Sequence, residues 1–501
     1  MSRRLLCPLL ALALTLAAAG AAPLTRNVRA LERRLSRIIA GPDFQHGFWG
    51  VYVYDATRQQ VLFDHNGERW FTPASNAKLF TLAAALQLLG PNYRFHTVVE
   101  TTAAPDDAGV IHGNVILVGV GDPSLSGRPY PYRNDPPEPA LPYDPMLVPR
   151  RLAQELAARG VKRIEGEVIG DDAYFADAPY PSGWAISDME WDYGAPVSAL
   201  TLNDNTRFLQ IFPTAPGAAP RLVWTPALDP PQLEDEARTG TAGSLTRLRL
   251  RTDALSGGLR LSGSIARSSR GVLEALAVHH PAGYAAGLLR QALQERGIMV
   301  GGGARGCHQN CESGRVYQLA EWESPPLAEI LQVTAKVSQN LEAELMLRLL
   351  GKLRGPPDAL SQARAGEAVR AEFLQHAGLN ARDTALVDGS GLARTDLVTP
   401  AGVVRLLRYM GRGPDAAVWK SLLPIAGVDG TLEHRFLHDP SARDRLRAKT
   451  GSLSHVNSLS GYVRARNGDQ LVFSLLSNNV DRPSSQVRHQ LDQMANVLAA
   501  W

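Results

Sequence analysis

The chain has 501 residues, of which 45% are hydrophobic and 20% are charged, and its formal net charge is +3. This length is enough for two or three domains, and the composition is that of a globular protein. A charge of +3 over the whole chain, without a long basic run, argues against a nucleic-acid partner.

The first predicted element is a secretory signal peptide at residues 1–21. Arg3 and Arg4 precede an apolar run over residues 5–19, and the small residues 19–21 fit the cleavage rule. The alternative is an uncleaved membrane anchor, but the run is shorter than the roughly 20 residues that span a bilayer. We therefore expect an exported, periplasmic protein.

The segments after the signal predict a helix, strands and a second helix. Residues 28–39 have the pattern of an amphipathic helix, and residues 49–54 alternate like a strand. Residues 61–63 are either the hairpin partner of that strand or a short continuation of it. A helix follows, because Pro73 suits a first helical turn and Gly90 suits a helix end.

The middle of the chain is rich in Pro, Gly and Asp and predicts a mostly β insertion. Residues 115–118 form an apolar run, and several segments within residues 222–265 alternate. In residues 246–251, for example, we expect the arginines to face solvent and the leucines to face a core. Helical character returns at residues 284–296.

The C-terminal part again mixes helices and strands. Helices are predicted at residues 327–350, at 400–410 with Thr399 as N-cap, and at 486–500, and buried strands at 459–463 and 471–475. The pattern indicates an α/β catalytic domain that a large, β-rich insertion splits in sequence. Its first part ends near the Pro73 helix, and its second part begins near residue 297.

Cysteine usage agrees with export. Cys7 would leave with the signal, so Cys307 and Cys311 remain as an even number. In an oxidising compartment they predict a local disulfide that closes a small loop. A metal site that includes His308 is the alternative, but structural zinc normally takes four protein ligands. We expect no metal.

Ser75 and Lys78 are the strongest candidates for chemistry. Ser75 lies near a helix N-terminus, where backbone N–H groups favour developing negative charge, and Lys78 lies one turn later on the same face. A desolvated lysine can act as the base for a nucleophilic serine. Among the lysines of the chain, only Lys78 has a serine three residues upstream. The pair matches the Ser-x-x-Lys motif of serine penicillin-recognising enzymes.

Two further motifs complete the set. Ser338-Gln339-Asn340 lies between two predicted helices, and Lys449-Thr450-Gly451-Ser452 precedes the strand at residues 459–463. On an edge strand, the second motif offers a charge, a hydroxyl and a glycine that lets a substrate backbone approach. An alternative to the Ser338 motif is Tyr132-Arg133-Asn134. It lies in a Pro-rich stretch without flanking helices, so we favour Ser338.

With these motifs in this order, the chain resembles the D-alanyl-D-alanine carboxypeptidase/endopeptidase family of class C low-molecular-mass penicillin-binding proteins, from about residue 30 to the end. Supporting stretches are residues 120–125, 193–196 with 198–200, 388–392 and 429–432. The long gap between Ser75 and Ser338 is a further trait of this family, because two extra domains are inserted there.

The resemblance implies a β-lactamase/transpeptidase-like catalytic domain, which is an antiparallel sheet flanked by helices plus a helical lobe. It implies a catalytic domain at residues 22–90 and 297–501, an inserted domain II at 91–188 and 272–296, and an inserted domain III at 189–271. It implies no cofactor.

The resemblance also implies an acyl-transfer mechanism. Ser75 is the nucleophile, and Lys78 is the base, with its pKa lowered by burial and by nearby Lys449. Ser338, linked to Lys449, relays a proton to the leaving amine. Asn340 holds the substrate amide.

The substrate-binding residues follow from the same resemblance. The backbone N–H groups of Ser75 and Ser452 form the oxyanion hole. The terminal carboxylate is bound by Lys449, Thr450 and Ser452, next to Gly451. Asp188 lies near the amino group of the substrate's side chain, and Tyr193 and Leu453 line the same pocket.

The implied partners are peptidoglycan peptides, with β-lactam antibiotics as covalent inhibitors. The sequence leaves peripheral membrane contact and a homodimer open. One alternative function is a β-lactamase or esterase on the same scaffold. Another is a non-catalytic wall-binding protein that uses the inserted domains.

Overall fold

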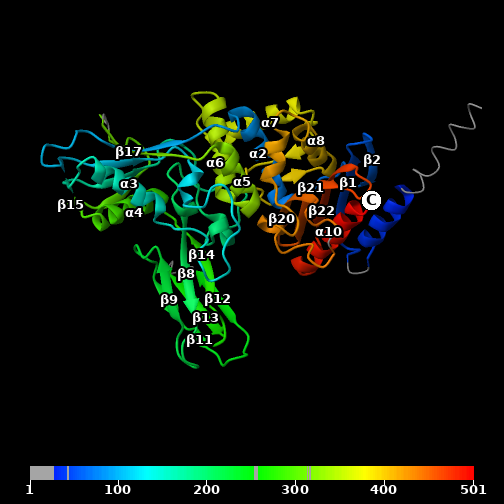
Figure 1. The fold of residues 1–501 in the computed structure, drawn as a ribbon, viewed down its shortest axis with the longest axis horizontal. Helices are drawn as coiled ribbons and strands as arrows, with labels where there is room; N and C mark the ends of the chain where they lie inside the picture. The colour runs from blue at the N-terminus through cyan, green and yellow to red at the C-terminus, as the bar shows by residue number, and fades with distance from the viewer. Residues whose placement is uncertain (1–27, 42–43, 253–257, 313, 315–316, 440) are drawn as a thin grey trace, which may run out of the picture.

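The computed structural model describes residues 28–501 except 42–43, 253–257, 313, 315–316 and 440, so the predicted signal peptide lies outside the described residues. Figure 1 shows a body with a sheet-and-helix part at one end, a mixed lobe at the other, and a β arm that projects between them. In the described part of the chain, no helix combines the length and apolarity needed to cross a membrane.

A five-stranded antiparallel sheet in the order β2-β1-β22-β21-β20 joins the two ends of the chain. Its strands are β1 (Phe48–Asp55), β2 (Gln60–His65), β20 (Leu446–Leu453), β21 (Val456–Arg464) and β22 (Gln470–Asn478). Residues 61–63 belong to β2, the hairpin partner of β1. The split α/β domain expected from the sequence is therefore confirmed.

Helices cover both faces of this sheet. On one face, the helix at residues 28–39 and α10 (Ser484–Ala499) bury Leu35 and Leu491 against Val51 and Leu459 of the sheet. On the other face lie α2 (Lys78–Leu89) and α8 (Pro400–Met410), whose N-cap Thr399 accepts a hydrogen bond from the Gly402 N–H as predicted. The sheet separates two apolar cores, one on each face.

A helical lobe completes the catalytic part. Its elements are α5 (Leu327–Val333), a π-helical turn (Thr334–Ser338), α6 (Asn340–Arg354), α7 (Gln362–His376), α9 (Ala416–Leu422) and the short pair β18 (Thr384–Ala385) and β19 (Leu397–Val398). The break between the π-helical turn and α6 places the Ser338 motif at a helix junction, as the sequence predicted.

The described residues of the mixed lobe form two sheets and two α-helices. One sheet runs β16 (Ala304–Cys307), β7 (Val168–Asp171), β5 (Val115–Val118), β3 (His96–Thr101), β17 (Tyr317–Glu323), and the other β15 (Met299–Val300), β6 (Arg163–Ile164), β4 (Val110–Ile111). The helices are α3 (Leu147–Ala158) and α4 (Pro281–Glu295). By strand pairing, the lobe extends to Glu323, past the border expected at residue 296.

The insertion is mostly β as expected, but the lobe contains one helix, α3, that was not predicted. The helix follows a Pro-rich segment, carries Pro149 in its first turn and is strongly charged on its outer side. Its apolar face consists of a few residues, Val148, Leu152 and Leu156, which are buried against α4. Packing of this apolar face against a neighbouring helix stabilises the segment.

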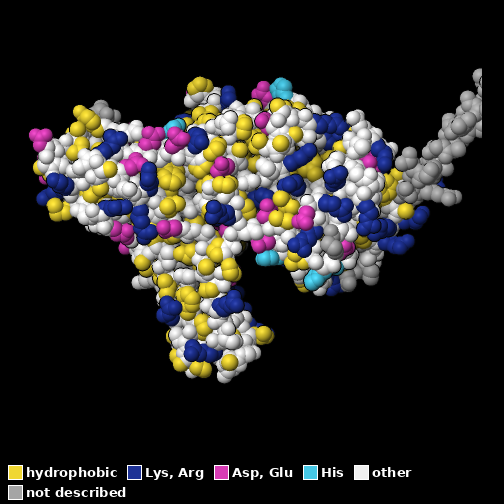
Figure 2. Space-filling model, in the orientation of Figure 1, with side chains coloured by type: hydrophobic (Ala, Val, Ile, Leu, Met, Phe, Trp, Pro, Cys, Tyr) yellow, Lys and Arg dark blue, Asp and Glu magenta, His cyan; other side chains and the backbone are white. Residues whose placement is uncertain are grey.

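The arm is all β. One sheet holds β14 (Val272–Ala277), β8 (Thr206–Phe212) and β9 (Arg221–Thr225), and the other β10 (Leu233–Asp235), β11 (Arg238–Thr239), β12 (Arg247–Thr252) and β13 (Leu259–Ile265). As predicted, Leu248 and Leu250 of β12 pack inward while its arginines are exposed. Figure 2 shows basic side chains on the arm's visible face.

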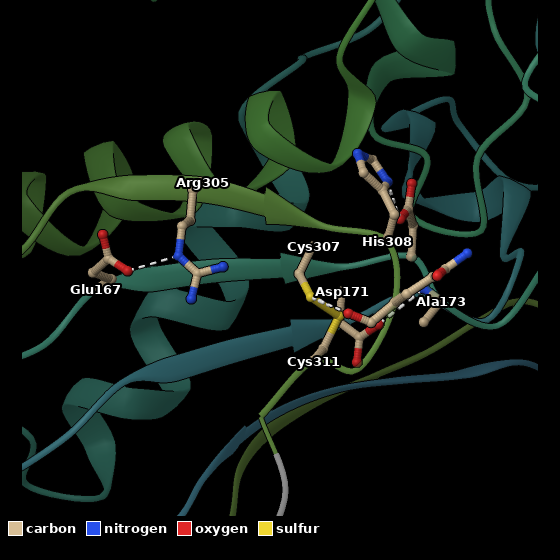
Figure 3. The surroundings of a disulfide bond; sticks show 9 residues. Glu167, Asp171, Ala173, Arg305, Cys307, His308 and Cys311 are labelled. Carbon is tan, nitrogen blue, oxygen red and sulfur yellow. Dashed lines mark hydrogen bonds and ion pairs between the residues drawn. A yellow bond between two sulfur atoms is a disulfide. The ribbon is translucent and has the colours of Figure 1, made fainter.

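Cys307 and Cys311 form a disulfide at the end of β16 (Figure 3). Within the loop that it closes, His308 Nδ1 lies 2.7 Å from Asp172 Oδ1, and Asp172 Oδ2 accepts a hydrogen bond from Ser198 at 2.7 Å. The described residues contain no group of three or more His, Cys, Asp or Glu placed to hold a metal ion.

Candidate active site

Ser75 lies in a short 3₁₀ turn (Ala74–Ala77) that leads directly into α2. Lys78, the first residue of α2, donates a hydrogen bond from Nζ to Ser75 Oγ at 3.0 Å. Ala74 before the serine has a φ of +50°, which costs a non-glycine residue free energy. Gly391 packs so closely that a Cβ on it would lie 1.9 Å from the Ala74 carbonyl oxygen. Tertiary packing thus holds the serine turn in a strained form.

Lys78 has two partners besides the serine. Its Nζ donates to Asn340 Oδ1 at 2.5 Å and to the Ser390 carbonyl at 2.8 Å. The side chain is 0% exposed, and burial lowers its pKa to about 8, although nearby carboxyl groups, Asp388 first among them, oppose this shift. A substantial fraction of the amine is therefore neutral near pH 8 and able to accept a proton.

Burial is the largest cause of the lowered pKa of Lys78. Burial, and then the charge of Lys78, also lower the pKa of Lys449 well below its usual value. Because repulsion between two amines acts on both, the lowering of the Lys78 pKa by Lys449 stays a prediction.

Lys449 lies on β20, the edge strand of the sheet, as predicted. Its Nζ donates to Ser338 Oγ at 2.8 Å and to the Thr450 carbonyl at 2.9 Å. Ser338 ends the π-helical turn with a φ of +64°, a second strained residue at the site. π-Helical turns and left-handed non-glycine residues cluster at functional sites.

Asn340 uses both ends of its amide within the protein. Its Oδ1 accepts from Lys78, and its Nδ2 donates to the Tyr193 carbonyl at 2.7 Å. The residue was predicted to hold the substrate amide. In this structure its oxygen contacts the lysine, and the second N–H of Nδ2 stays available to a substrate, so the role toward the substrate amide stays a prediction.

Gly451 brings the edge strand against the serine turn. A Cβ there would lie 2.3 Å from Ser458 Oγ and 2.9 Å from Ser75 N, so a side chain would force the two apart. Thr450 and Ser452, on either side of Gly451, each contact another side chain. Thr450 Oγ1 lies 2.8 Å from Thr431 Oγ1, and Ser452 Oγ lies 3.2 Å from Asn457 Oδ1. Thr450 and Ser452 retain hydrogen-bonding capacity toward a ligand.

The sequence of residues 388–391 predicts a turn that buttresses the cleft, and in the structure this turn contacts Lys78. The buried Asp388 carboxylate accepts hydrogen bonds from the N–H groups of Ser390, Gly391 and Ala393 and from Trp184 Nε1. These bonds aim the Ser390 carbonyl at Lys78. The Asp-Gly-Ser-Gly pattern signalled a tight turn, but only its placement in the fold shows that it touches the lysine.

The three residues expected around the substrate side chain lie at the edge of the site. Tyr193 is 41% exposed and is linked to Asn340 through its carbonyl. Asp188 ends a short 3₁₀ helix (Ile186–Asp188) beside Tyr193, and burial raises the pKa of its carboxyl. Leu453 is the last residue of β20 and is half-buried.

The alternative Tyr132-Arg133-Asn134 motif takes no part in the lysine network. Asn134 Nδ2 donates to the Val428 carbonyl at 3.0 Å, and its Oδ1 accepts from the Gly430 N–H at 3.3 Å. The Pro-rich segment therefore lies over the loop that carries Thr431. Ser338, as favoured from the sequence, is the serine that contacts Lys449.

Comparisons with known proteins cover almost the whole chain. The family model described as "D-Ala-D-Ala carboxypeptidase 3 (S13) family" matches residues 31–500. A D-alanyl-D-alanine carboxypeptidase of Actinomadura sp. (strain R39) is 32% identical over 467 residues, which are 91% of this chain and 82% of that protein. The carboxypeptidase DacB of Haemophilus influenzae is 26% identical over 85% of this chain and 84% of its own.

The fold has solved counterparts. The crystal structure of penicillin-binding protein 4 from Haemophilus influenzae matches with a TM-score of 0.76 at 25% identity, covering 92% of this chain and 97% of that one. A second structure of that protein, complexed with a novel β-lactam, matches with a TM-score of 0.70 at 24% identity and covers 94% and 98% of the two chains.

Proposed function

From its membership of the D-Ala-D-Ala carboxypeptidase 3 (S13) family, as a serine-type D-Ala-D-Ala carboxypeptidase, we propose a more specific function for this chain. It is a periplasmic enzyme that trims peptidoglycan stem peptides and also hydrolyses their cross-links. The observation that supports the chemistry most directly is the pair of Ser75 Oγ and Lys78 Nζ, 3.0 Å apart with the amine buried. Export rests on the signal sequence, and the cross-link substrate rests on the resemblance to carboxypeptidase/endopeptidases.

The acylation step begins at Ser75. Neutral Lys78 takes the hydroxyl proton as Ser75 Oγ attacks the carbonyl carbon of the D-Ala-D-Ala bond, or of the D-amide in a cross-link. The Ser390 carbonyl and Asn340 Oδ1 hold the amine in place. The oxyanion would lie between the N–H groups of Ser75 and Ser452, and such a donor contributes about 3 kcal/mol to transition-state binding.

Departure of the amine completes acylation. The proton on Lys78 passes through Ser338, which contacts Lys449, to the leaving nitrogen as the C–N bond breaks. Lys449, Thr450 and Ser452 would hold the carboxylate of the leaving residue. Lys78 is then neutral again, and it can activate the water that hydrolyses the ester.

The same route explains penicillin binding. A β-lactam amide would acylate Ser75, but its leaving nitrogen stays tethered and blocks the entry of water. The Haemophilus penicillin-binding protein 4 has been solved with a β-lactam bound, in keeping with this expectation.

Intact-mass analysis with benzylpenicillin tests the proposal. We expect one covalent adduct, mapped by proteolysis to Ser75, and none with Ser75→Ala, which should also lose D-alanine release from a pentapeptide and cleavage of a cross-linked muropeptide. An adduct on another residue, or cleavage that persists in Ser75→Ala, would overturn the mechanism. Rapid nitrocefin turnover without an accumulating adduct would indicate a β-lactamase. Cleavage of the pentapeptide without cleavage of the cross-linked muropeptide would overturn the proposed endopeptidase activity.

A further inference from the structure

A cavity of about 310 Å³ opens beside the Ser338 motif. Ser338, Gln339 and Asn340 form one end of it, and the Pro-rich segment, the β arm and the loop before Tyr193 form the rest. Its volume lies at the small end of the range for ligand pockets.

The cavity is acidic. Asp135 and Glu138 are exposed at its rim, Asp192 is half-buried along its wall, and Asp204 is buried. One cation lines it, Arg128, and this residue is already paired with Asp204 through Nε and Nη2 at 2.9 and 2.8 Å. The carboxylates of Asp135, Glu138 and Asp192 therefore face a cavity whose one lining cation, Arg128, is paired with Asp204.

Asp204 provides an independent sign of a missing partner. Its side chain is 1% exposed and lines the cavity. Arg128 binds its Oδ2, whereas Oδ1 has no hydrogen-bond partner among the described residues. Its φ of +53° lies within a run of three left-handed residues, 203–205. A buried carboxylate oxygen without a donor costs free energy and leaves the charge of Asp204 only partly compensated.

The other walls are apolar. Phe208, Leu273 and Ala275 of the arm and Val337 before the serine line the cavity between its acidic groups. This combination fits a basic side chain, whose methylene groups pack on apolar surface while the charged end reaches carboxylates. A bound metal ion fits less well, because the described residues include no cluster of three or more acidic, His or Cys ligands placed to hold one.

The cavity lies on the side of the leaving group. It begins at Ser338, which the mechanism places next to the leaving amine. Asp135 follows Asn134, which is bonded to Gly430 beside Thr431, and Thr431 contacts Thr450 of the carboxylate-binding strand. A side chain on the residue that departs would thus point away from the scissile bond toward the acidic groups.

We infer that this cavity is a leaving-group subsite that selects a C-terminal D-residue with a basic side chain, an inference that rests on the proposed function. The carboxylate of that residue binds at Lys449 and Thr450, and its protonated side-chain amine binds among Asp135, Glu138 and Asp192. The enzyme then releases D-lysine or a similar basic D-amino acid faster than a neutral residue of the same size.

The test uses the mature full-length chain and three peptides that differ only in the last residue: acyl-D-Ala-D-Lys, acyl-D-Ala-D-norleucine and acyl-D-Ala-D-Ala. D-Norleucine matches the D-lysine stem without its charge. We expect kcat/KM for the D-Lys peptide to exceed that for the D-norleucine peptide about tenfold. Asp192→Asn and the double change Glu138→Gln/Asp192→Asn should lower this ratio stepwise toward one.

Glu372→Gln is the matched control, because it removes one exposed carboxylate from α7, away from the cavity. It should leave the ratio unchanged. Equal kcat/KM for the D-Lys and D-norleucine peptides, or a ratio that Glu138→Gln/Asp192→Asn does not lower, would overturn the subsite. Release of D-Ala and acylation by benzylpenicillin would continue in that case. Loss of both in the unmodified enzyme would instead overturn the proposed function.

Discussion

The catalytic part buries charged side chains, whereas the β arm exposes them. In the catalytic part, Lys78 and Lys449 are 0% exposed, and the α6 carboxylates Glu342 and Glu344 are buried with them. In the arm, the arginines of β12 are exposed, and the small core is built from apolar residues such as Leu250 and Leu261. Burying a charge costs free energy, so a fold retains it where chemistry depends on it. The two buried lysines and the carboxylates near them therefore make this region a candidate for chemistry.

Burial changes the buried acids as well as the lysines. The pKa of Glu344 rises to about 7 and that of Glu342 to about 8, with burial as the largest cause in each. Glu344 Oε1 accepts from the Gly389 N–H, and Glu342 Oε2 accepts from Thr334 Oγ1. These groups lie behind the residues that hold Lys78, so the environment around the base is poorly solvated on its inner side.

Lys78→Met gives the strongest test of this contrast. Loss of the base should slow acylation by benzylpenicillin about 10³- to 10⁴-fold. The same change should raise the free energy of unfolding at pH 7 by on the order of 1–3 kcal/mol, because the buried amine has a pKa near 8 in the fold but its ordinary, higher value when unfolded. Since the unfolded lysine binds the proton more tightly, the gain should shrink as the pH rises above 8.

The matched control for that change is Arg249→Met on the arm. It removes an exposed cation, so we expect acylation and unfolding free energy to stay within about 0.5 kcal/mol of the starting protein. A similar loss of acylation from both variants in stopped-flow assays, or a destabilised Lys78→Met protein in urea melts, would contradict the contrast between the two regions.

Asn340→Asp should have the next largest effect. A carboxylate would then stand 2.5 Å from Lys78 Nζ in place of the amide oxygen and raise the pKa of the lysine. We expect acylation at pH 7 to fall about tenfold or more and the rising limb of its pH profile to move up by about one pH unit or more. A profile that is slower but unshifted would mean that Asn340 acts only on the substrate.

The pH dependence of the unmodified enzyme tests the state of Lys78 directly. Because the neutral amine is the base and its pKa is about 8, acylation should rise about tenfold per pH unit below pH 8 and level off above it. Single-turnover rates with benzylpenicillin between pH 5.5 and 9.5 measure this limb. A flat profile across this range would exclude Lys78 as the titrating base.

Leu261→Ala should have the smallest effect on the chemistry. Leu261 is buried in the arm's core, and its truncation should destabilise the arm by about 2–4 kcal/mol. Benzylpenicillin acylation of the folded protein should remain unchanged, since the residue belongs to a core separate from those at the site. Hydrogen exchange measured by mass spectrometry should show faster opening confined to the arm. A parallel loss of acylation would show that the arm supports the site.

Local sequence determined the elements on which the chemistry lies. A spacing of three residues along a helix places Ser75 and Lys78 on one face. The alternation of residues along a strand places the arginines of β12 on its outer face. Both patterns follow from the geometry of the backbone. The motifs at Ser338 and Lys449 follow from residue types in short segments. The family, the fold class and the main candidates for catalysis were therefore predictable before any distance was known.

Only the tertiary structure decided how those segments meet. Lys78 and Asn340 are 262 residues apart, and Lys449 and Ser338 are 111 apart, yet each pair forms a hydrogen bond. The Ser390 carbonyl on Lys78, the helix α3 and the acidic cavity beside Ser338 also depend on contacts between distant segments. The lowered pKa of Lys78 arises in the same way, because exclusion of water around an amine is a property of the packed fold and of no local pattern.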